Sequence, residues 1–359
     1  MKRVAILGAN GQVGSEVSLR LRGVDDIEVV PIARNLSGSA FLRLNGMECR
    51  HGRISDPAEA RDLIGDCDVV VTFALSNTAI PRTDREMNRQ IVRSMVAAAK
   101  PGAPIVFAST IMVYAPAMKF WLPDSYGLEK LIAERVFRRL CRTSRHPAFV
   151  FRLGHVIGEL QNLTSKIRGE IRDGKVALPH EGCRASNTVF TAAIVEAIVQ
   201  VARAAPKPGT YDLITFPQWT WLDVYKYYAA ELGLPLQLAQ VEQVRGHGLG
   251  SPSGLMRRWL RYLANHHALT ERLTFLVAFL PRSVNQRMYL RYLQTRALSE
   301  INALRQSENV EFSVEDWREL RVRSLGQMAD PVNLMARYPL RSALEFRGSK
   351  QTAAKLQSS

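Results

Sequence analysis

The stretch GANGQVG, residues 8–14, follows directly on a short apolar run, Arg3–Leu7, and leads into an amphipathic segment from Gln12 to Arg22. Glycines in such a stretch let the backbone turn sharply and approach a pyrophosphate, whose charge is stabilised at the N-terminus of the following helix. Strand, turn and helix in this order predict a dinucleotide-binding unit rather than a plain tight turn. The predicted cofactor contacts of this unit are Gly8, Asn10, Gly11, Gln12, Val13 and Gly14.

Short β-branched runs continue to alternate with amphipathic stretches as far as Arg152. The expected strands are Arg3–Leu7, Glu28–Ile32, Val69–Phe73, Ile105–Ala108 and Phe149–Arg152. The expected helices are Gln12–Arg22, Pro57–Leu63, Thr83–Ala99 and Tyr126–Arg142, with a later one at Thr191–Arg203. This pattern is typical of right-handed βαβ units. It predicts an α/β fold, a Rossmann doubly wound parallel sheet with a small substrate lobe and an extra C-terminal helical region.

The chain divides into three parts by composition. We expect a Rossmann domain over residues 1–245, with its substrate lobe drawn mainly from 152–190 and 205–245, where Gly and Pro interrupt the alternation. The Gly- and Ser-rich segment Val244–Gly254 predicts a linker. Leu and aromatic residues at helical spacing predict a basic α-helical extension over 255–340, and the polar tail 348–359 predicts disorder.

Basic residues exceed acidic ones by 15, and 7 of these excess charges lie between residues 251 and 298. Such a surplus favours phosphorylated ligands, nucleic acid or an acidic membrane surface. The basic segment carries no nucleic-acid-binding motif, so we expect no nucleic-acid partner. Arginines alternating with Leu and aromatic residues over 255–304 fit peripheral contact with an anionic membrane. They fit equally well packing on the core or an oligomer contact, as in a homodimer.

The cysteines and the apolar runs exclude other classes of protein. The four cysteines lie far apart without a CxxC pair, so we expect neither a metal site nor a disulfide framework. The apolar run Phe275–Leu280 is much shorter than the ~20 residues of a membrane span. The N-terminal run Val4–Leu7 is too short for a signal peptide. These features predict a cytoplasmic protein, with peripheral membrane contact only if 255–304 provides it.

The end of the second expected strand bears on the choice of cofactor. An NAD-binding unit usually has Asp or Glu there, about 20 residues after the glycine motif, to hold the ribose hydroxyls. This chain has Arg34 instead. A guanidinium suits the 2′-phosphate of NADP, so NADP is preferred over NAD. The alternative is a solvated surface arginine.

Tyr126 and Lys130 lie four residues apart at the start of an expected helix, and therefore on one face. A lysine ammonium in that position lowers the pKa of a neighbouring phenol and makes it an acid/base group near neutral pH. The preceding expected strand leads into Ser109 and Thr110. These hydroxyls belong to the carboxyl edge of the sheet, where ligands bind in this architecture.

Several motifs occur in one order: GANGQVG, DVVVTFA (68–74), Asn88 in REMNRQIV, STIMVY (109–114), YGLEK (126–130) and RLGHVIG (152–158). With them the chain, up to about residue 215, resembles the extended short-chain dehydrogenase/reductases, also called the NAD-dependent epimerase/dehydratase family. The resemblance implies that Tyr126 is the general acid/base, that Lys130 binds the nicotinamide ribose and that Thr110 hydrogen-bonds the substrate oxygen. It adds Ile54, Ala74 and Asn88 to the cofactor contacts and Ser109 to the substrate contacts.

The chain departs from the family pattern in two places. Arg53 stands in GRI, where relatives have an acidic residue that contacts adenine. Together with Arg34 it favours NADP as the cofactor. Ile111 and Met112 follow Thr110, where 4,6-dehydratases of the family have Asp-Glu. Dehydration is therefore not expected.

Three residues of the later motifs are candidates for substrate binding. His155 stands where many relatives have a substrate-binding Asn, and Arg184 where relatives have an arginine on the nucleotide-sugar diphosphate. Asn162 is a further candidate for the same phosphates. An ordinary buried histidine and a surface arginine are the alternatives for His155 and Arg184.

The resemblance implies an NAD(P)-dependent oxidoreductase that acts on a nucleotide sugar or a related glycosyl substrate, as in polysaccharide biosynthesis. It would be either an epimerase, which retains its cofactor, or a 4-keto reductase, which consumes NADPH. The alternative is a noncatalytic NAD(P)-binding sensor or assembly factor, since some members of the family keep the fold without the chemistry.

Overall fold

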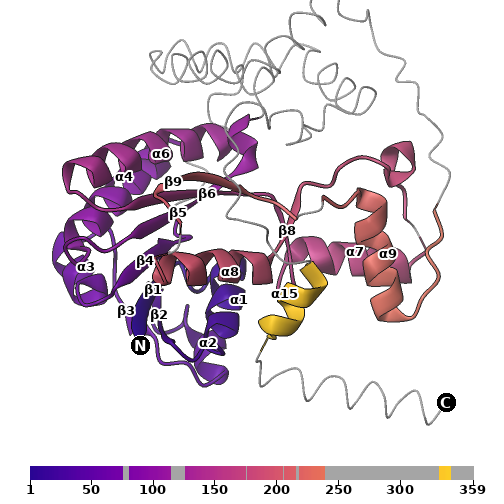
Figure 1. Ribbon diagram of the computed structural model, residues 1–359, viewed down its shortest axis with the longest axis horizontal. Helices are drawn as coiled ribbons and strands as arrows, with labels where there is room; N and C mark the ends of the chain where they lie inside the picture. The colour runs from indigo at the N-terminus through magenta and orange to yellow at the C-terminus, as the bar shows by residue number, and fades with distance from the viewer. Residues whose placement is uncertain are drawn as a thin grey trace, which may run out of the picture.

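The computed structural model describes residues 1–75, 81–114, 126–174, 176–204, 206–215, 218–238 and 331–340. Its centre is a seven-stranded sheet in the order β3-β2-β1-β4-β5-β6-β9 (Figure 1). The strands are β1 (Lys2–Leu7), β2 (Ile27–Ala33), β3 (Arg50–His51), β4 (Val69–Thr72), β5 (Ile105–Thr110), β6 (Ala148–Leu153) and β9 (Gly209–Leu213). Every neighbouring pair is parallel. The predicted Rossmann fold class is therefore confirmed.

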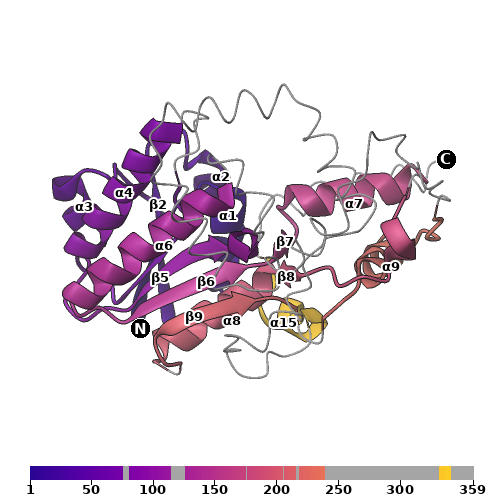
Figure 2. The ribbon, with the colours of Figure 1, turned by 90° about the horizontal axis from the view of Figure 1, so that it is seen from above.

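Helices cover both faces of this sheet (Figures 1 and 2). The helices of one face are α1 (Gln12–Leu21), α8 (Thr191–Ala202) and α15 (Pro331–Arg337). The helices of the other face are α3 (Pro57–Ile64), α4 (Pro81–Ala98) and α6 (Tyr126–Thr143). The short α2 (Ala40–Leu44) follows β2 in the chain. Because both faces are covered, the strands are apolar almost throughout, and Val69–Thr72 is buried at every position.

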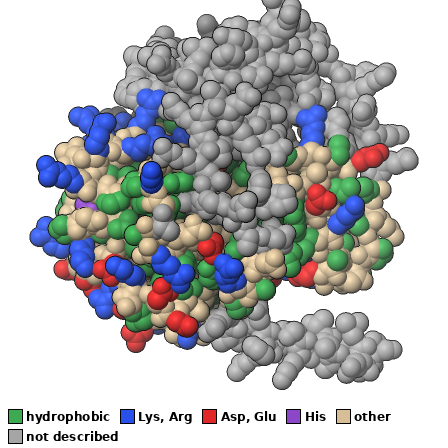
Figure 3. Space-filling view, viewed as in Figure 1, with side chains coloured by type: hydrophobic (Ala, Val, Ile, Leu, Met, Phe, Trp, Pro, Cys, Tyr) green, Lys and Arg blue, Asp and Glu red, His purple; other side chains and the backbone are tan. Residues whose placement is uncertain are grey.

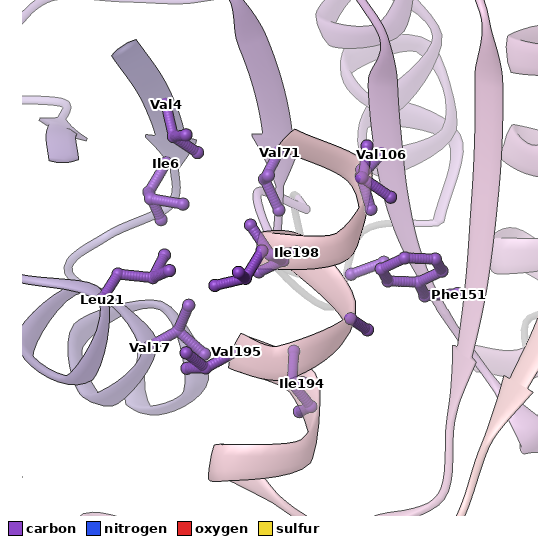
Figure 4. Packing of buried hydrophobic residues seen from close by; sticks show 14 of the residues in the cluster. Val4, Ile6, Val17, Leu21, Val71, Val106, Phe151, Ile194, Val195 and Ile198 are labelled. Carbon is purple, nitrogen blue, oxygen red and sulfur yellow. The ribbon is translucent and has the colours of Figure 1, made fainter. Parts of the chain in front are cut away.

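The larger core lies between the sheet and α8. This helix is apolar nearly all round, with Ile198 toward the strands and Val195 beside Val17 of α1 (Figure 4). Figure 4 shows Ile198 in front of Val71 and Val106, with Phe151 alongside. A helix that is hydrophobic around its circumference must be buried on several sides, and α8 meets the sheet, α1 and α15.

A smaller lobe lies beside the carboxyl end of the sheet, on the right in Figure 1. Its elements are β7 (His155–Ile157), α7 (Asn162–Arg172), the 3-10 turn Pro179–Gly182, β8 (Thr188–Phe190) and α9 (Trp221–Leu232). β7 and β8 form a separate parallel pair, and the lobe has its own apolar cluster. α9 begins with a capping box between Thr220 and Asp223 and ends at Gly233, whose φ of +66° suits glycine.

The segment 331–340 packs on the Rossmann domain through α15. Leu334 and Tyr338 are buried against α8, and the Tyr338 hydroxyl donates a hydrogen bond to Glu196 (2.6 Å). This part of the predicted 255–340 extension thus belongs structurally to the first domain. The predicted linker 244–254, the stretch 255–330 and the tail 348–359 lie outside the described residues.

The described surface carries charges of both signs. On the face seen in Figure 3, lysines and arginines are spread over the Rossmann domain, with acidic side chains among them along its lower edge. Among the described residues, no helix has the length and hydrophobicity needed to span a membrane.

Candidate active site

The glycine turn lies at the carboxyl end of β1, where the strand order reverses between β1 and β4. Gly8 has a φ of +75°, and a Cβ there would lie 2.8 Å from the backbone nitrogen of Ala74. The N–H of Gly11 closes the turn by donating to the Gly8 carbonyl (3.0 Å). Doubly wound sheets bind ligands at such a reversal of strand order. The structure therefore brings the predicted turn and Ala74 together at the expected crevice.

The N-terminus of α1 is open toward this crevice. Gly11 is the N-cap residue, and its lack of a side chain leaves the first amides of the helix without a side-chain cap. A Cβ on Gly14 would lie 2.3 Å from the carbonyl oxygen of Gly8, so only glycine lets the helix approach the turn this closely. Asn10 and Gln12 are exposed, whereas Val13 packs against the core. Uncapped amides at a helix N-terminus are suited to bind a phosphate.

Arg34 directly follows β2 and is exposed. It forms no ion pair with another residue in the described part of the chain. The loop after it is shaped by the side chain of Asn35, which accepts the N–H of Gly38 (2.8 Å). Ser39 Oγ lies 2.8 Å from His51 Nε2 at the end of β3. The guanidinium therefore projects from an ordered loop beside the edge of the sheet that carries the glycine turn.

Arg53 has a partner within the chain. Its side chain, 65% exposed, pairs with Glu59 of α3 (Nη2 to Oε1, 2.9 Å), and its backbone N–H donates to the same carboxylate (2.6 Å). Ile54 is half-buried against α3 and α4, and Asn88 is buried on α4. The roles of these three residues in cofactor binding stay predictions.

Lys130 is buried between α6 and β5. Its Nζ donates to the carbonyl oxygen of Ala108 (2.7 Å) and lies 5.1 Å from the centre of the Phe107 ring. Burial lowers the pKa of Lys130 to about 8, against the opposing effect of the Glu134 charge. The amine can therefore change its charge in the range of pH where enzymes work.

Thr110 is the last residue of β5, and its Oγ1 accepts the N–H of Met112 (3.1 Å) in the turn Ile111–Tyr114. The structure thus places Thr110 two residues beyond the carbonyl that holds Lys130. Tyr126 begins α6, one helical turn before Lys130, and its side chain lies outside the described part of the structure.

Ser109 points into the protein. Its Oγ donates to Glu134 Oε1 (2.5 Å), and both side chains are buried. Arg152 of β6 completes a buried ion pair with the same carboxylate (Nη2 to Oε2, 2.8 Å). This hydroxyl therefore takes part in an internal network, and its contact with substrate stays a prediction.

His155 begins β7 two residues after Leu153, which is paired with Thr110 across β5 and β6. The His155 ring is 5.6 Å from the ring of Trp221, between centroids. Desolvation lowers the pKa of His155, which favours the neutral imidazole near pH 7. The backbone N–H of Trp221 donates to the carbonyl of Arg184 (3.0 Å).

Trp221 thus contacts His155 with its ring and the Arg184 backbone with its N–H; the sequence does not single out Trp221, because no motif surrounds it. Arg184 is half-buried. Asn162 begins α7 and is exposed, and no described contact joins it to this group. Among the described residues, no cluster of three or more His, Cys, Asp or Glu suited to a metal occurs.

A second buried network lies behind the glycine turn. Glu16 of α1 pairs with Arg20 (2.8 Å) and accepts the hydroxyl of Thr191 (2.5 Å) and the side-chain amide of Gln161 (2.9 Å). Gln161 Nε2 also donates to the carbonyl of Gln12 (3.1 Å). This network joins the glycine turn to the smaller lobe. The Glu16–Arg20 spacing of four residues is the only hint of it in the sequence.

The fold and the site together define a Rossmann protein of the short-chain dehydrogenase/reductase type. A profile of the NAD dependent epimerase/dehydratase family matches residues 4–213, which is more than half of the chain. The chain therefore belongs to that family, the extended short-chain dehydrogenase/reductases, as its motifs predicted. No curated protein sequence matches it significantly.

Solved structures of low sequence identity share the fold. dTDP-glucose 4,6-dehydratase from Bacillus anthracis, in complex with NAD, has a TM-score of 0.53 at 18% identity, over 67% of this chain and 84% of that one. UDP-glucuronic acid 4-epimerase from Bacillus cereus, in complex with NAD, has a TM-score of 0.52 at 16% identity, over 66% of this chain and 87% of that one. RMD from Pseudomonas aeruginosa, complexed with NADPH, has a TM-score of 0.50 at 14% identity, over 67% of this chain and 86% of that one.

Proposed function

We propose that this protein is an NAD(P)-dependent oxidoreductase that epimerises or reduces a nucleotide sugar or a related glycosyl substrate. The observation that carries the proposal is the buried Lys130 ammonium, held by the Ala108 carbonyl two residues before Thr110. Tyr126 precedes this lysine by one helical turn. With Tyr126 as the acid/base group, its phenol, the Lys130 ammonium and the Thr110 hydroxyl would form the set that hydride transfer to or from a sugar carbon requires.

The glycine turn fits a dinucleotide. Side chains at Gly8 and Gly14 would collide with backbone atoms, whereas a Cβ at Gly11 would meet only the Gly8 carbonyl, at 3.4 Å. The space next to Gly11 and the uncapped amides of α1 would hold the pyrophosphate. The bound nicotinamide would supply the hydride acceptor or donor. Arg34 would hold the 2′-phosphate, and we therefore propose NADP as the preferred cofactor.

Side chains of the protein would transfer the proton to or from the reacting oxygen. Thr110 would orient the reacting oxygen through its hydroxyl, and the Tyr126 phenol would give or take the proton at that oxygen. Lys130, charged below a pKa of about 8, would stabilise the phenolate. Ile111 and Met112 follow Thr110 and cannot act as acid or base, which argues against dehydration.

The substrate would bind on the side of the smaller lobe. Its diphosphate would meet Arg184 and Asn162, and its sugar would lie near His155 and Thr110. Structural neighbours acting on dTDP-glucose and UDP-glucuronic acid support this class of substrate. The neighbours are complexed with NAD or with NADPH, which supports a nicotinamide cofactor, and the preference for NADP rests on Arg34.

A Tyr126→Phe variant tests the proposal. Wild-type protein is titrated with NADPH and NADH and then assayed with dTDP-glucose, UDP-N-acetylglucosamine, UDP-glucuronic acid and a 4-keto nucleotide sugar. We expect the variant to bind NADPH within about twofold of wild type and to lose at least about 100-fold in turnover, since general acid/base groups contribute 10²–10⁴-fold. Tyr211→Phe, which removes a phenol bonded to the Lys207 carbonyl beside β9, is the matched control.

The result also distinguishes an enzyme from a sensor. Wild-type turnover in Tyr126→Phe would contradict the proposed chemistry. NADPH binding without turnover of any of these substrates by wild type would instead favour the noncatalytic sensor or assembly factor.

Peripheral membrane contact through 255–304, a cytoplasmic location and a homodimer stay predictions from the sequence. The membrane contact rests on the net charge of +7 over residues 251–298, and the cytoplasmic location on the short N-terminal apolar run. Flotation with liposomes that contain or lack anionic lipid tests the membrane contact, and equal flotation in both would contradict it. Light scattering during gel filtration tests the homodimer.

A further inference from the structure

The carboxylate of Glu134 is buried one helical turn after Lys130 on α6, and four hydrogen bonds surround it. Oε1 accepts from Ser109 Oγ (2.5 Å) and Arg152 Nε (3.1 Å). Oε2 accepts from Arg152 Nη2 (2.8 Å) and Arg138 Nη2 (2.5 Å). A carboxylate that is entirely inaccessible needs such compensation, because an unpaired buried charge is strongly unfavourable.

These bonds fasten α6 to the sheet at successive residues of β5. Lys130 binds the carbonyl of Ala108, and Glu134 binds the side chain of Ser109. Thr110 follows immediately. Through Arg152 the same carboxylate reaches β6, and through Arg138, whose Nη2 also donates to Thr210 Oγ1 (3.2 Å), the network reaches β9.

The buried Glu134 carboxylate therefore connects α6, which carries Tyr126 and Lys130, to β5, which carries Thr110. We propose that Glu134 is a positioning residue that fixes α6 on β5 so that Tyr126, Lys130 and Thr110 stand at the distances the proposed reaction requires. This inference rests on the proposed function. It assigns a role to Ser109 other than substrate binding.

The charge of Glu134 has a second effect. Burial lowers the pKa of Lys130, and the Glu134 carboxylate works against that effect. Burial also opposes ionisation of Glu134 itself, but the charge and hydrogen bonds of Arg152, with those of Arg138 and Ser109, outweigh burial and lower the pKa of this carboxyl. Glu134 therefore stays ionised while Lys130 titrates, and its loss makes the lysine harder to protonate.

Glu134→Gln tests both effects, because it keeps the shape and removes the charge. We expect kcat to fall at least about 100-fold while KM and the Kd for NADPH change less than about twofold, since misplacement by about 1 Å costs this much. In the free enzyme, the NMR titration midpoint of Lys130, followed at its ¹³C-labelled Cε, moves to lower pH.

Glu134→Gln removes the charge that pairs with the buried Arg152 and can fail to fold. Ser109→Ala is the second variant, because it leaves both arginine pairs and breaks only the link to β5. We expect it to fold and to lose about tenfold in kcat at unchanged NADPH affinity. Thr210→Val is the matched control, since it removes a hydroxyl at the far end of the network, and its kcat stays within about twofold.

The outcomes separate this inference from the proposed function. If the wild type is active and Ser109→Ala keeps the wild-type kcat, as does Glu134→Gln where it folds, the positioning role is overturned. The proposed function is not affected by that result. An unchanged Lys130 midpoint in folded Glu134→Gln overturns the electrostatic part. A wild type that binds NADPH but turns over none of the nucleotide sugars overturns the proposed function, and the positioning role with it.

Discussion

Gly14→Ala and Gly11→Ala form a pair of variants that separate the structural role of the glycine turn from its binding role. At Gly14 the new Cβ would lie 2.3 Å from the Gly8 carbonyl oxygen, 2.9 Å from the carbon of that group and 3.0 Å from Ala9 Cα. Ordinary contacts begin at 3.4 Å, so α1 has to move by about 1.1 Å relative to the turn. All three atoms belong to the backbone, so no flexible side chain can give way.

This overlap lowers the free energy of unfolding of the Gly14→Ala variant. Overpacking of a core costs about 1–3 kcal/mol, and the rigid surroundings place Gly14→Ala at about 3 kcal/mol. In a domain of this size each kcal/mol lowers Tm by about 2–4 °C, so we expect a Tm lower by about 6–12 °C. Gly11 has a φ of −80° and its Cβ fits at 3.4 Å, so Gly11→Ala changes the stability by no more than about 1 kcal/mol.

Both variants should bind NADPH at least about tenfold more weakly, because the Gly11 methyl fills the space proposed for the pyrophosphate and the Gly14 methyl displaces the helix that faces it. Thermal unfolding of the free protein and a fluorescence titration with NADPH measure the two effects. Gly169→Ala in α7, which has no atom within 4 Å of the new Cβ, is the control and should gain about 0.5–1 kcal/mol. Wild-type NADPH affinity in Gly11→Ala would refute the assignment of this turn to the cofactor, and a wild-type Tm in Gly14→Ala would refute the packing argument.

Three further predictions concern the cofactor, the C-terminal segment and the active-site lysine. Arg34→Ala should weaken NADPH binding about tenfold or more and leave NADH binding unchanged, as measured by parallel titrations; an equal loss for both would contradict a 2′-phosphate contact. Leu334→Ala, at a side chain only 1% exposed, should lower the free energy of unfolding in urea by about 2–5 kcal/mol, against less than about 0.5 kcal/mol for the matched Leu44→Ala at a side chain 70% exposed. Activity should decline as pH rises through about 8, where Lys130 loses its proton, and the residual activity of Lys130→Arg should persist to higher pH because a guanidinium stays charged; identical pH profiles would contradict this role.

Local periodicity is enough to predict the parallel sheet, because strands buried on both faces are nearly continuous apolar runs. The expected strands and helices up to β6 correspond to observed ones with ends shifted by a residue or two. β3 and β9 are not predicted. Two residues, Arg50–His51, cannot show a period, and β9 interrupts its apolar residues with Asp212. Both become strands through pairing with β2 and β6, which is a tertiary effect.

The candidate site likewise has parts that the sequence predicts and parts that depend on tertiary contacts. The glycine turn and the placement of Tyr126 and Lys130 one turn apart on α6 are predictable, because each depends on a short motif whose members are close in the chain. The contact between Trp221 and His155 joins α9 to β7, and the bond from Ser109 to Glu134 joins β5 to α6. Neither pair has a fixed spacing that the sequence could reveal. For Ser109 the motif indicates a substrate contact, whereas the fold turns the hydroxyl toward an internal carboxylate.

The described C-terminal segment, residues 331–340, is packed into the Rossmann domain. Arg20 of α1 is buried, and besides its pair with Glu16 it donates through Nη1 to the carbonyl of Tyr338 (2.5 Å). A buried guanidinium needs its donors satisfied, so a carbonyl from 331–340 completes a network that begins beside the cofactor turn. The segment is therefore part of the same folding unit as α1 and α8. Leu238 pairs with Val176 in the smaller lobe, so the described residues on both sides of 239–330 are packed into the folded structure.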